Sequence, residues 1–221
     1  MRDLTSYQTL VFDCDGVVLD SNFAKIDAYR EVALQFGASV DQAEALVQHH
    51  IQLGGISRYP KFEYFLREIM RVAITPEAMQ TLLDGFTQLV RKKLQVCAIS
   101  PHLDALRDAT AKAKWMMISG GDQIELRDVM QQRGLQRYFD AGIFGSPDNK
   151  QAILAREIKD GRLQKPALFL GDSRYDFLSA SEAQLDFVFL HGWTDVEDWS
   201  AFCQQHQIEV MADLGDLIKQ P

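Results

Sequence analysis

The sequence predicts an α/β protein with a doubly wound, mostly parallel, Rossmann-like sheet and an inserted α-helical cap domain. Short apolar runs of strand-forming residues alternate with helical patterns over the second half of the chain, which is typical of βαβ units. One further apolar run lies near the N-terminus, and about 70 residues with helical periodicity alone follow it. We therefore expect residues 1–20 and 94–221 to form the α/β core, and residues 21–93 to form the helical cap.

The strands of the core are expected where apolar, β-branched and aromatic residues cluster. The first, at 9–12, ends abruptly at Asp13-Cys14-Asp15-Gly16, as expected for a buried strand whose carboxyl end faces a ligand. Further strands are expected at 115–119, 141–144, 167–170 and 187–190, and the segment 208–219 can add one more strand and a helix. Helices are expected at 100–113, at 120–133, and after Lys150 and Ser173. Such alternation places helices on both faces of a parallel sheet.

Four helices are expected in the cap. The first spans residues 23–36 and is closed by Gly37, and the second runs from Ser39 to residue 50. The third carries an apolar face between residues 62 and 70. Thr75-Pro76-Glu77 predicts the start of the fourth, which ends near residue 93, because it supplies an N-cap, a first-turn proline and an acid near the helix dipole. Four helices without an intervening strand predict a small bundle.

Composition and charge exclude several classes of protein. The chain has 221 residues, of which 47% are hydrophobic and 24% charged, and this argues against wholesale disorder. Its formal net charge of −8 opposes binding to polyanions, so we expect neither a nucleic-acid partner nor a membrane partner. No apolar signal core opens the sequence, and no apolar run is long enough for a membrane span. Cys14, Cys97 and Cys203 are too few and too widely spaced for a disulfide framework, which favours a cytoplasmic location.

Polar residues follow the expected strands and share one chemistry. Because the carboxyl ends of parallel strands meet at one edge of a sheet, we expect these side chains to lie together. Clustered carboxylates repel one another and require a cation, and hard oxygen ligands favour Mg²⁺. A lysine and a hydroxyl beside that ion suit a phosphoryl group, and Gly16 and Gly120 would let backbone N–H groups approach its oxygens. The polar residues are Asp13, Asp15, Ser119, Lys150, Asp172 and Asp176.

These residues belong to four motifs, each at an expected strand end or in the loop that follows. The motifs are Asp13-Cys14-Asp15-Gly16-Val17-Val18, Ser119, Lys150 and Gly171-Asp172-Ser173-Arg174-Tyr175-Asp176. Each motif is weak by itself, but the set in this order resembles the haloacid dehalogenase superfamily of phosphatases and phosphomutases. The helical insertion directly after the first motif resembles the small cap of the β-phosphoglucomutase and phosphoglycolate phosphatase branch. The resemblance covers the core from residue 9 to about residue 180.

The resemblance implies a role for each motif. Asp13 would be the nucleophile that forms an aspartyl-phosphate, and Asp15 would be the general acid for the leaving oxygen and then the base for water. Ser119 would hydrogen-bond a phosphoryl oxygen, and Lys150 would neutralise the phosphoryl group. Asp15 would bind the metal through its backbone carbonyl, and Asp172 would bind it directly. Asp176 would bind it through water or would orient the neighbouring groups. The metal-binding residues would be Asp13, Asp15, Asp172 and Asp176.

Simpler structural roles are open for some of these residues. Ser119 could cap the helix expected at Gly120, and Asp176 could only support the dipole of the helix it begins. Lys150 could be an ordinary first-turn residue, although a lysine there opposes the helix dipole.

In the cap, the glycine-broken stretch 49–61 is expected to face the core and to set substrate choice. His49, Arg58 and Lys61 are its candidates for binding substrate, and Lys25, near the hinge, is a weaker one. The alternative is a solvated loop between two helices.

Taken with this resemblance, the motifs predict a Mg²⁺-dependent phosphohydrolase that acts on a small phosphorylated metabolite, most simply a phosphosugar, through an aspartyl-phosphate. Asp15 favours phosphate chemistry, because the true dehalogenases of the superfamily lack this second aspartate. One alternative is a phosphosugar mutase, which would use the same residues and return the phosphoryl group to substrate. A second alternative is a phosphate-accepting signalling domain without turnover, which the large insertion after the first strand disfavours.

Overall fold

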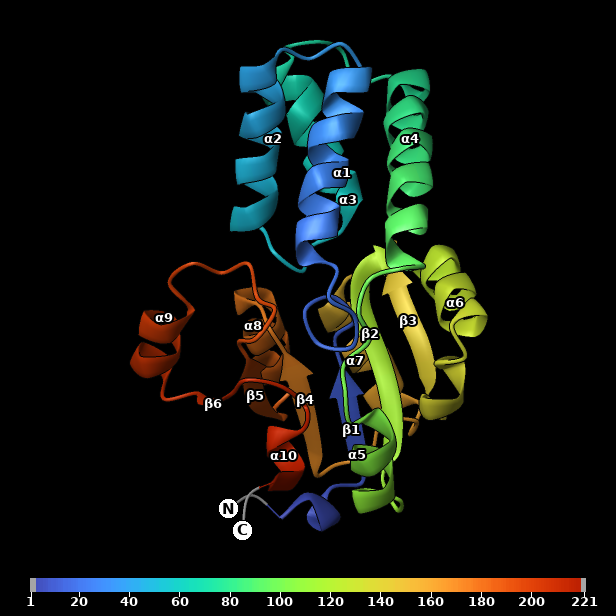
Figure 1. Ribbon diagram of the computed structural model, residues 1–221, viewed down its shortest axis with the longest axis vertical. Coiled ribbons are helices and arrows are strands. Elements are labelled where there is room, and N and C mark those ends of the chain that lie inside the picture. The colour runs from blue at the N-terminus through green and yellow to red at the C-terminus, as the bar shows by residue number, and fades with distance from the viewer. Residues whose placement is uncertain (1–2, 220–221) are drawn as a thin grey trace.

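The structure, a computed structural model that describes residues 3–219, consists of two parts stacked along its long axis (Figure 1). One part is a six-stranded sheet with helices on both faces, and the other is a helical cap. The strand order is β3-β2-β1-β4-β5-β6, and neighbouring strands are parallel throughout. The prediction of a doubly wound, Rossmann-like sheet with an inserted helical cap is confirmed.

The motif-bearing strands lie at the centre of this sheet. β1 (Thr9–Phe12) is flanked by β2 (Lys114–Asp122) and β4 (Ala167–Gly171). β3 (Gly142–Ser146) lies outside β2, while β5 (Asp186–Leu190) and β6 (Glu209–Met211) continue the sheet beyond β4. Because the strands are parallel, their carboxyl ends share one edge, and Figure 1 shows that this edge faces the cap.

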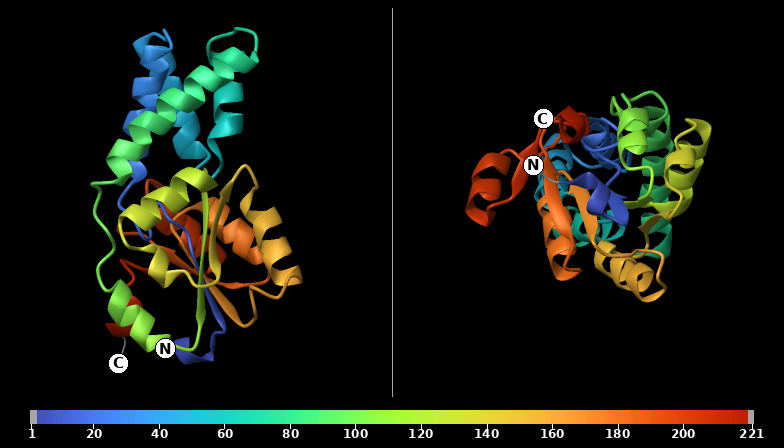
Figure 2. Two further views of the ribbon diagram at one scale, coloured as in Figure 1. Left: turned by 90° about the vertical axis from the view of Figure 1, so that its right-hand side faces the viewer. Right: turned by 90° about the horizontal axis from the view of Figure 1, so that it is seen from below.

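Helices cover both faces of the sheet because successive strand residues point to opposite sides. Leu10 and Phe12 of β1 belong to an apolar cluster that includes residues of α5 (Leu103–Ala109), α6 (Gln123–Gln132) and α10 (Asp216–Lys219). Val11 belongs to a second cluster with α7 (Lys150–Lys159), α8 (Arg174–Glu182) and α9 (Trp199–His206). Figure 2 shows α10 at the end of the molecule opposite the cap.

The cap is a bundle of α1 (Asn22–Gln35), α2 (Val40–Gln52), α3 (Arg58–Tyr64) and α4 (Pro76–Leu94), in which α3 continues into a π-helical turn over Phe65–Ile69. Local signals start these helices. The Ser39 hydroxyl accepts a hydrogen bond from the N–H of Gln42, whose side chain accepts one from the N–H of Ser39. Thr75 caps α4 ahead of Pro76. None of the helices within residues 3–219 is both long enough and apolar enough to cross a membrane.

The boundaries of α5 and α6 differ most from the sequence prediction. β2 extends to Asp122 and α6 begins only at Gln123, because Asp122 pairs with Ser146 of β3 and its side chain caps the helix at the N–H groups of Ile124 and Glu125. α5 is shorter than the expected 100–113, because the chain must turn after Ala109 to enter β2 at Lys114.

Two connections join cap and core, and they run side by side. The N–H of Asp20 donates to the carbonyl of Ala98 at 3.0 Å, and the N–H of Ser100 donates to the carbonyl of Val18 at 2.9 Å. These paired segments, between the end of β1 and the start of α1 and between α4 and α5, are where the cap can pivot on the core.

Candidate active site

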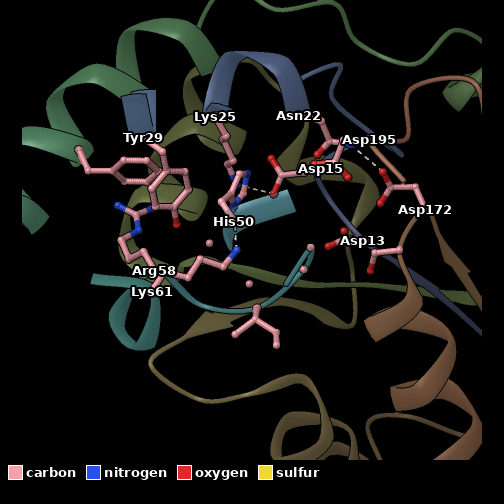
Figure 3. Close-up of a pocket in the computed structure, with 17 residues that line it drawn as sticks. Asp13, Asp15, Asn22, Lys25, Tyr29, His50, Arg58, Lys61, Asp172 and Asp195 are labelled. Carbon is pink, nitrogen blue, oxygen red and sulfur yellow. Dashed lines mark hydrogen bonds and ion pairs between the residues drawn. The ribbon is translucent and has the colours of Figure 1, made fainter. Parts of the chain in front are cut away.

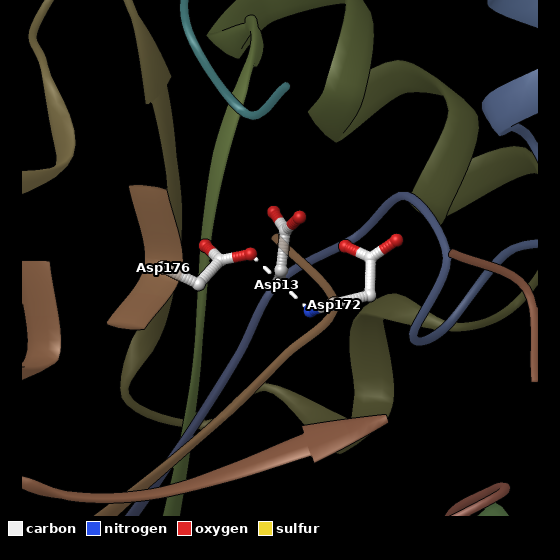
Figure 4. Close-up of side chains that lie close together, drawn as sticks. All are labelled: Asp13, Asp172 and Asp176. Atoms are coloured by element: carbon white, nitrogen blue, oxygen red, sulfur yellow. Dashed lines mark hydrogen bonds between the residues drawn. The ribbon is translucent and has the colours of Figure 1, made fainter. Parts of the chain in front are cut away.

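Three carboxylates meet at the edge of the sheet that faces the cap (Figure 4). Asp13 follows β1, Asp172 follows β4, and Asp176 lies in the first turn of α8. All three are buried, and one oxygen of each lies within 4.8 Å of the others. Adjacent parallel strands bring Asp13 and Asp172 together although they are far apart in sequence.

Asp176 is fixed by the start of its own helix. Its carboxylate accepts hydrogen bonds from the Ser173 hydroxyl at 2.7 Å and from the Ser173 N–H at 3.1 Å. The Ser173 hydroxyl in turn accepts from the N–H of Asp176 at 3.1 Å, which completes a capping box. Asp176 therefore both supports the start of α8 and belongs to the carboxylate cluster.

Lys150, the first residue of α7, bridges two of the carboxylates. Its Nζ lies 2.9 Å from Asp13 Oδ1, and it also forms an ion pair with Asp176. Burial lowers the pKa of Lys150, but the charges of Asp13 and Asp176 raise it by more, so the side chain remains an ammonium.

The cluster has the charge and the free oxygen that suit a divalent cation. Burial raises the pKa of Asp13 to about 7 despite Lys150, and burial together with the charges of Asp13 and Asp176 raises the pKa of Asp172 well above its usual value. Asp13 Oδ1 is buried, and apart from the Lys150 ammonium at 2.9 Å it has no hydrogen-bond donor among the described residues. Three carboxylates with one ammonium therefore fit Mg²⁺, which prefers such oxygen ligands and would favour their ionised form.

The loop after β1 passes so close to Asp172 that position 16 requires glycine. Gly16 has a φ of +73°, and a Cβ there would lie 1.9 Å from Asp172 Oδ2. Asn22, the first residue of α1, donates from Nδ2 to Asp172 Oδ2 at 2.7 Å and to the carbonyl of Trp193 at 2.9 Å. The start of the cap therefore orients a carboxylate of the core.

Asp15 contacts the cap rather than the carboxylate cluster. The Ser21 hydroxyl donates to Asp15 Oδ1 at 2.5 Å instead of capping α1, and the ammonium of Lys25 on α1 forms an ion pair with Oδ2. Burial raises the pKa of Asp15, but Lys25 and Ser21 lower it by more, so the pKa is below its usual value. With the cap closed on the core, Asp15 is held as a carboxylate.

Ser119 lies beside Asp15 and does not cap the following helix. Its hydroxyl is 3.4 Å from Asp15 Oδ2 and accepts a hydrogen bond from the N–H of Gly121 at 3.0 Å. Asp122 caps α6 instead, so the alternative role for Ser119 as a helix cap is wrong. The buried hydroxyl of Ser119 therefore lies at the edge of the site, beside Asp15.

The loop between α2 and α3 inserts into this edge. A Cβ at Gly120 would lie 2.2 Å from the carbonyl oxygen of Gly55, so glycine is needed for the close approach of the two backbones. The Ser57 hydroxyl lies 2.6 Å from the Ser146 hydroxyl of β3. The cap is therefore closed on the core.

Arg58 secures this closure with a buried ion pair. Its guanidinium lies 2.7 Å from Glu125 of α6, and the two side chains are 4% and 5% exposed. It also donates to the Thr87 hydroxyl of α4 at 3.0 Å. The charge of Arg58 is thus compensated by a carboxylate of the core.

Lys61, one turn further along α3, has no such compensation. The side chain is 1% exposed and forms no ion pair with any residue in 3–219, and its Nζ lies 2.8 Å from His50 Nδ1. Burial and the charge of Lys25 lower the pKa of Lys61 to about 7. Burial and the charge of Lys61 lower the pKa of His50 well below its usual value, so this ring is neutral. Within the described chain, the buried Nε2 of His50 has no hydrogen-bond partner.

One cavity joins these groups (Figure 3). Asp13 and Asp172 lie on its core side, Tyr29, His50, Arg58 and Lys61 on its cap side, and Asp15 and Lys25 between them. About 40 Å³ of it is open to the centres of water molecules, so with the cap closed it has room for only a few waters, each of which needs ~10–15 Å³ by this measure. A substrate therefore enters only after the cap opens.

The family model for haloacid dehalogenase-like hydrolases matches residues 7–184, most of the chain. The chain belongs to this family. The match extends from just before β1 to the end of α8, and so includes all four motifs of the hydrolase. No curated protein is significantly similar to the chain in sequence.

Solved structures share the fold of this hydrolase over nearly its whole length. A predicted phosphoglycolate phosphatase from Haemophilus somnus superposes with a TM-score of 0.74 at 17% identity, covering 97% of this chain and 98% of that chain. A phosphonoacetaldehyde hydrolase-like protein from Oleispira antarctica gives a TM-score of 0.71 at 17% identity, with 98% and 92% covered. CbbY from Rhodobacter sphaeroides, in complex with phosphate, gives 0.71 at 16% identity, with 96% of each chain covered. At such identities the likeness establishes the fold alone.

The residues predicted for the site of this hydrolase fall into two groups. Those at one edge of the sheet are Asp13, Asp15, Gly16, Ser119, Gly120, Lys150, Asp172 and Asp176. Arg58 and Lys61 of the cap line the same cavity. His49 is not among the residues that line it; its ring stacks on Tyr64 with centroids 3.7 Å apart. The side chain of Asp15 does not join the cluster of three carboxylates.

Several residues of the hydrolase's cavity were not singled out from the sequence. Asn22 and Tyr29 lie on the same face of α1 as Lys25, and this spacing of three and four residues directly after the first motif could have revealed them. Glu125 and Asp195 carry no local signal, because their place at the site depends on how the cap and the loop after β5 approach it.

Proposed function

We propose that the protein is a Mg²⁺-dependent phosphatase that hydrolyses a small phosphorylated metabolite through an aspartyl-phosphate on Asp13. The buried arrangement of Asp13, Asp172 and Asp176 around Lys150, at the bottom of a cavity covered by the cap, carries this proposal. Membership of a hydrolase family and the phosphatase names of its structural neighbours support it. The proposed substrate is a phosphosugar or a related metabolite that fits a capped site.

In the first half of the reaction, a carboxylate oxygen of Asp13 attacks phosphorus, and the bond between phosphorus and the leaving oxygen breaks. Asp15 protonates the leaving oxygen. Lys25 and Ser21 favour the carboxylate form of Asp15, and an anionic phosphoryl group beside it would raise its pKa towards the protonated form. Lys150 and Ser119 face the phosphoryl oxygens.

In the second half, water attacks the phosphorus of the aspartyl-phosphate, and the bond between phosphorus and the Asp13 oxygen breaks. The Asp15 carboxylate, which lost its proton in the first half, accepts a proton from this water and is again the acid. Phosphate leaves and Asp13 is restored. The carboxylates of Asp13, Asp172 and Asp176, with the backbone carbonyl of Asp15, would hold Mg²⁺. When bound, the ion would offset negative charge on the phosphoryl group. Asn22 and Gly16 keep Asp172 in place for this role.

A phosphosugar mutase is the second candidate, and the small closed cavity favours it. A mutase must keep water away from the aspartyl-phosphate until the phosphoryl group returns to substrate, and the closed cap leaves little room for water. The two functions differ in product, because a mutase yields a phosphosugar isomer and a phosphatase yields inorganic phosphate. A signalling domain is less well supported, because Asp13 is buried in a cavity that cap residues also line.

The test is release of phosphate from p-nitrophenyl phosphate with Mg²⁺ and with EDTA. We expect Mg²⁺-dependent release that Asp13→Asn abolishes, while Asp108→Asn, an exposed aspartate outside the cavity, retains it. Release that persists in Asp13→Asn would overturn the assignment of the nucleophile. Stable phosphorylation of Asp13 without release would indicate the signalling function, and isomerisation of a hexose phosphate without release would indicate a mutase.

The cellular setting of the proposed reaction follows from the cysteines. Cys14, Cys97 and Cys203 are unpaired thiols, which is compatible with a reducing compartment, and we propose a cytoplasmic enzyme whose partner is its small-molecule substrate.

A further inference from the structure

The start of α1 reaches from the cap to two carboxylates of the core. Ser21 and Lys25 contact Asp15. Asn22 contacts Asp172, which belongs to the cluster that suits a divalent cation. Among the hydrogen bonds of residues 3–219, that of Asn22 alone joins a cap side chain to a carboxylate of this cluster.

The Asn22 amide holds one oxygen of Asp172 and leaves the other for a cation. Its Nδ2 donates to Asp172 Oδ2 at 2.7 Å and to the carbonyl of Trp193 at 2.9 Å, so the core uses both protons of the amide. The same Oδ2 lies against Gly16, where an added Cβ would be 1.9 Å away. Asn22 is only 8% exposed, which hinders its replacement by water. The orientation of Asp172 therefore depends on a residue of the cap.

Asn22 moves with the cap, whereas both of its acceptors belong to the core. The two connections between cap and core pair at Asp20 and Ala98, two residues before Asn22 begins α1. Rotation of the cap about this pairing carries α1 away from the end of β4 and from the loop after β5, and so lengthens or breaks both hydrogen bonds. Opening therefore leaves Asp172 without the donor that orients it, and the open form would bind Mg²⁺ more weakly.

Two further contacts that close the cap do not reach the cluster. Arg58 pairs with Glu125 of α6. The Ser57 hydroxyl lies 2.6 Å from the Ser146 hydroxyl of β3. Because neither contact involves a carboxylate of the cluster, neither links the position of the cap to the presence of an ion.

We propose that Asn22 couples Mg²⁺ binding to closure of the cap, so that the closed form binds the ion more tightly and closure is favoured when the ion is bound. The proposal rests on the Mg²⁺-dependent phosphatase function proposed above and adds a regulation of its site. Asn22 is a positioning residue, because it acts through Asp172. Coupling between two equilibria is reciprocal, so the same factor must appear in the affinity for Mg²⁺ and in the population of the closed form.

Lys61 can report on the position of the cap. It lines the cavity between cap and core (Figure 3) and is 1% exposed, so an acylating reagent reaches its amine only in the open form. The experiment follows acetylation of Lys61 by N-acetoxysuccinimide with mass spectrometry, in Mg²⁺ and in EDTA, without substrate. Exposed Lys92 of the cap is the internal control and should react at the same rate in every sample.

In wild-type protein we expect Mg²⁺ to slow acetylation of Lys61 roughly tenfold, the lower end of the effect that a partner of a metal ligand has on metal affinity. A cation in the cavity would by itself lower the pKa of Lys61 and speed the reaction, so slowing reports closure. Asn22→Leu, which keeps the size of the side chain and removes the donor, should abolish the slowing. It should also raise the Kd for Mg²⁺ roughly tenfold in isothermal titration calorimetry.

Two variants separate the coupling from a merely structural role. Thr194→Val removes a hydrogen bond of 2.6 Å that reaches the carbonyl of Asp172 from within the core, and it should keep the slowing by Mg²⁺. Gly120→Ala obstructs closure without touching the cluster, so by reciprocity it should raise the Kd for Mg²⁺ roughly tenfold. In the Asn22→Leu background, Gly120→Ala should raise that Kd no further.

Mg²⁺ binding that leaves acetylation of wild-type Lys61 unchanged would overturn the coupling, while Mg²⁺-dependent release of phosphate would still support the phosphatase function. Equal slowing in wild type and Asn22→Leu would overturn the role of Asn22. No binding of Mg²⁺ to the wild-type protein in calorimetry would overturn the metal site, and with it both proposals. If Asn22→Leu does not fold, Asn22→Ala takes its place with the same expectations, and a Kd for Mg²⁺ that Gly120→Ala leaves unchanged would overturn the coupling without any change at Asn22.

Discussion

Burial of Lys61 should make the stability of the fold depend on pH in a way that Lys61→Met removes. Its pKa is about 7 in the folded protein, lowered by burial and by Lys25, against ~10.4 in an unfolded chain. Between these values the unfolded state binds one proton more, so the free energy of unfolding rises with pH from about 7 upwards. Below pH 7 both states are protonated, and the destabilisation from the buried charge is fully present.

The expected magnitude follows from this titration. Between pH 6 and pH 8 the folded state of wild-type protein passes from nearly full protonation to nearly full deprotonation at Lys61, whereas the unfolded state stays protonated. Integration over this range gives a gain of about 1.4 kcal/mol, one pH unit of linkage, that Lys61→Met should lack. The assay is urea denaturation of both proteins at pH 6 and pH 8, with EDTA and without phosphate, so that the cavity remains empty.

Two controls separate Lys61 from other titrating groups. Lys92→Met changes an exposed lysine and should show the pH dependence of wild type. Because His50 shares a hydrogen bond with Lys61, the comparison is repeated between His50→Gln and the double variant His50→Gln with Lys61→Met. A difference between pH 6 and pH 8 that is the same in wild type and Lys61→Met within about 0.4 kcal/mol would refute the reasoning, because the lysine would then not be buried as a charge.

Three further outcomes test closure, the metal site and the contact between cap and core. Gly120→Ala should lower kcat/KM roughly 100-fold, because the added Cβ would lie 2.2 Å from the carbonyl oxygen of Gly55 in the cap loop. At Gly54 the nearest atom to an added Cβ is 3.6 Å away, so Gly54→Ala should have a much smaller effect. Equal effects of the two changes would contradict the closed geometry. Mg²⁺ at about 100 times its Kd should stabilise the wild-type protein against thermal unfolding by about 2.7 kcal/mol. Asp172→Asn should lose most of this stabilisation, because it removes one carboxylate of the cluster. An unchanged stabilisation in Asp172→Asn would mean that the ion binds elsewhere. Arg58→Met should lower the free energy of unfolding by about 3–5 kcal/mol in urea denaturation, because it leaves Glu125 buried without a partner. The double variant with Glu125→Met should regain most of that free energy. Additive losses from the two changes would show that Arg58 and Glu125 are not coupled.

The core of the fold and the carboxylates of the site were predictable because their signals are local. A short apolar run such as 9–12 predicts a buried strand, and in a parallel sheet the residue after that strand must lie at the shared carboxyl edge. The proximity of Asp13 and Asp172 could therefore be predicted without knowing how the cap folds. The boundary after Ser119 was not predictable, because pairing with β3 keeps Gly120 and Gly121 extended although their sequence resembles the start of a helix.

The sequence by itself determined the class of fold, the inserted helical bundle and the grouping of acids with one lysine, since periodicity and strand order depend on neighbours along the chain. Only the tertiary structure decided what the basic residues of the cap do. Arg58 and Lys61 lie one turn apart on the same helix, yet Arg58 meets Glu125 of α6 and Lys61 meets the uncharged ring of His50. The difference arises because a charge buried between two domains acquires its partner from whatever side chain the opposite surface presents, and that contact is set by packing, not by spacing in the sequence.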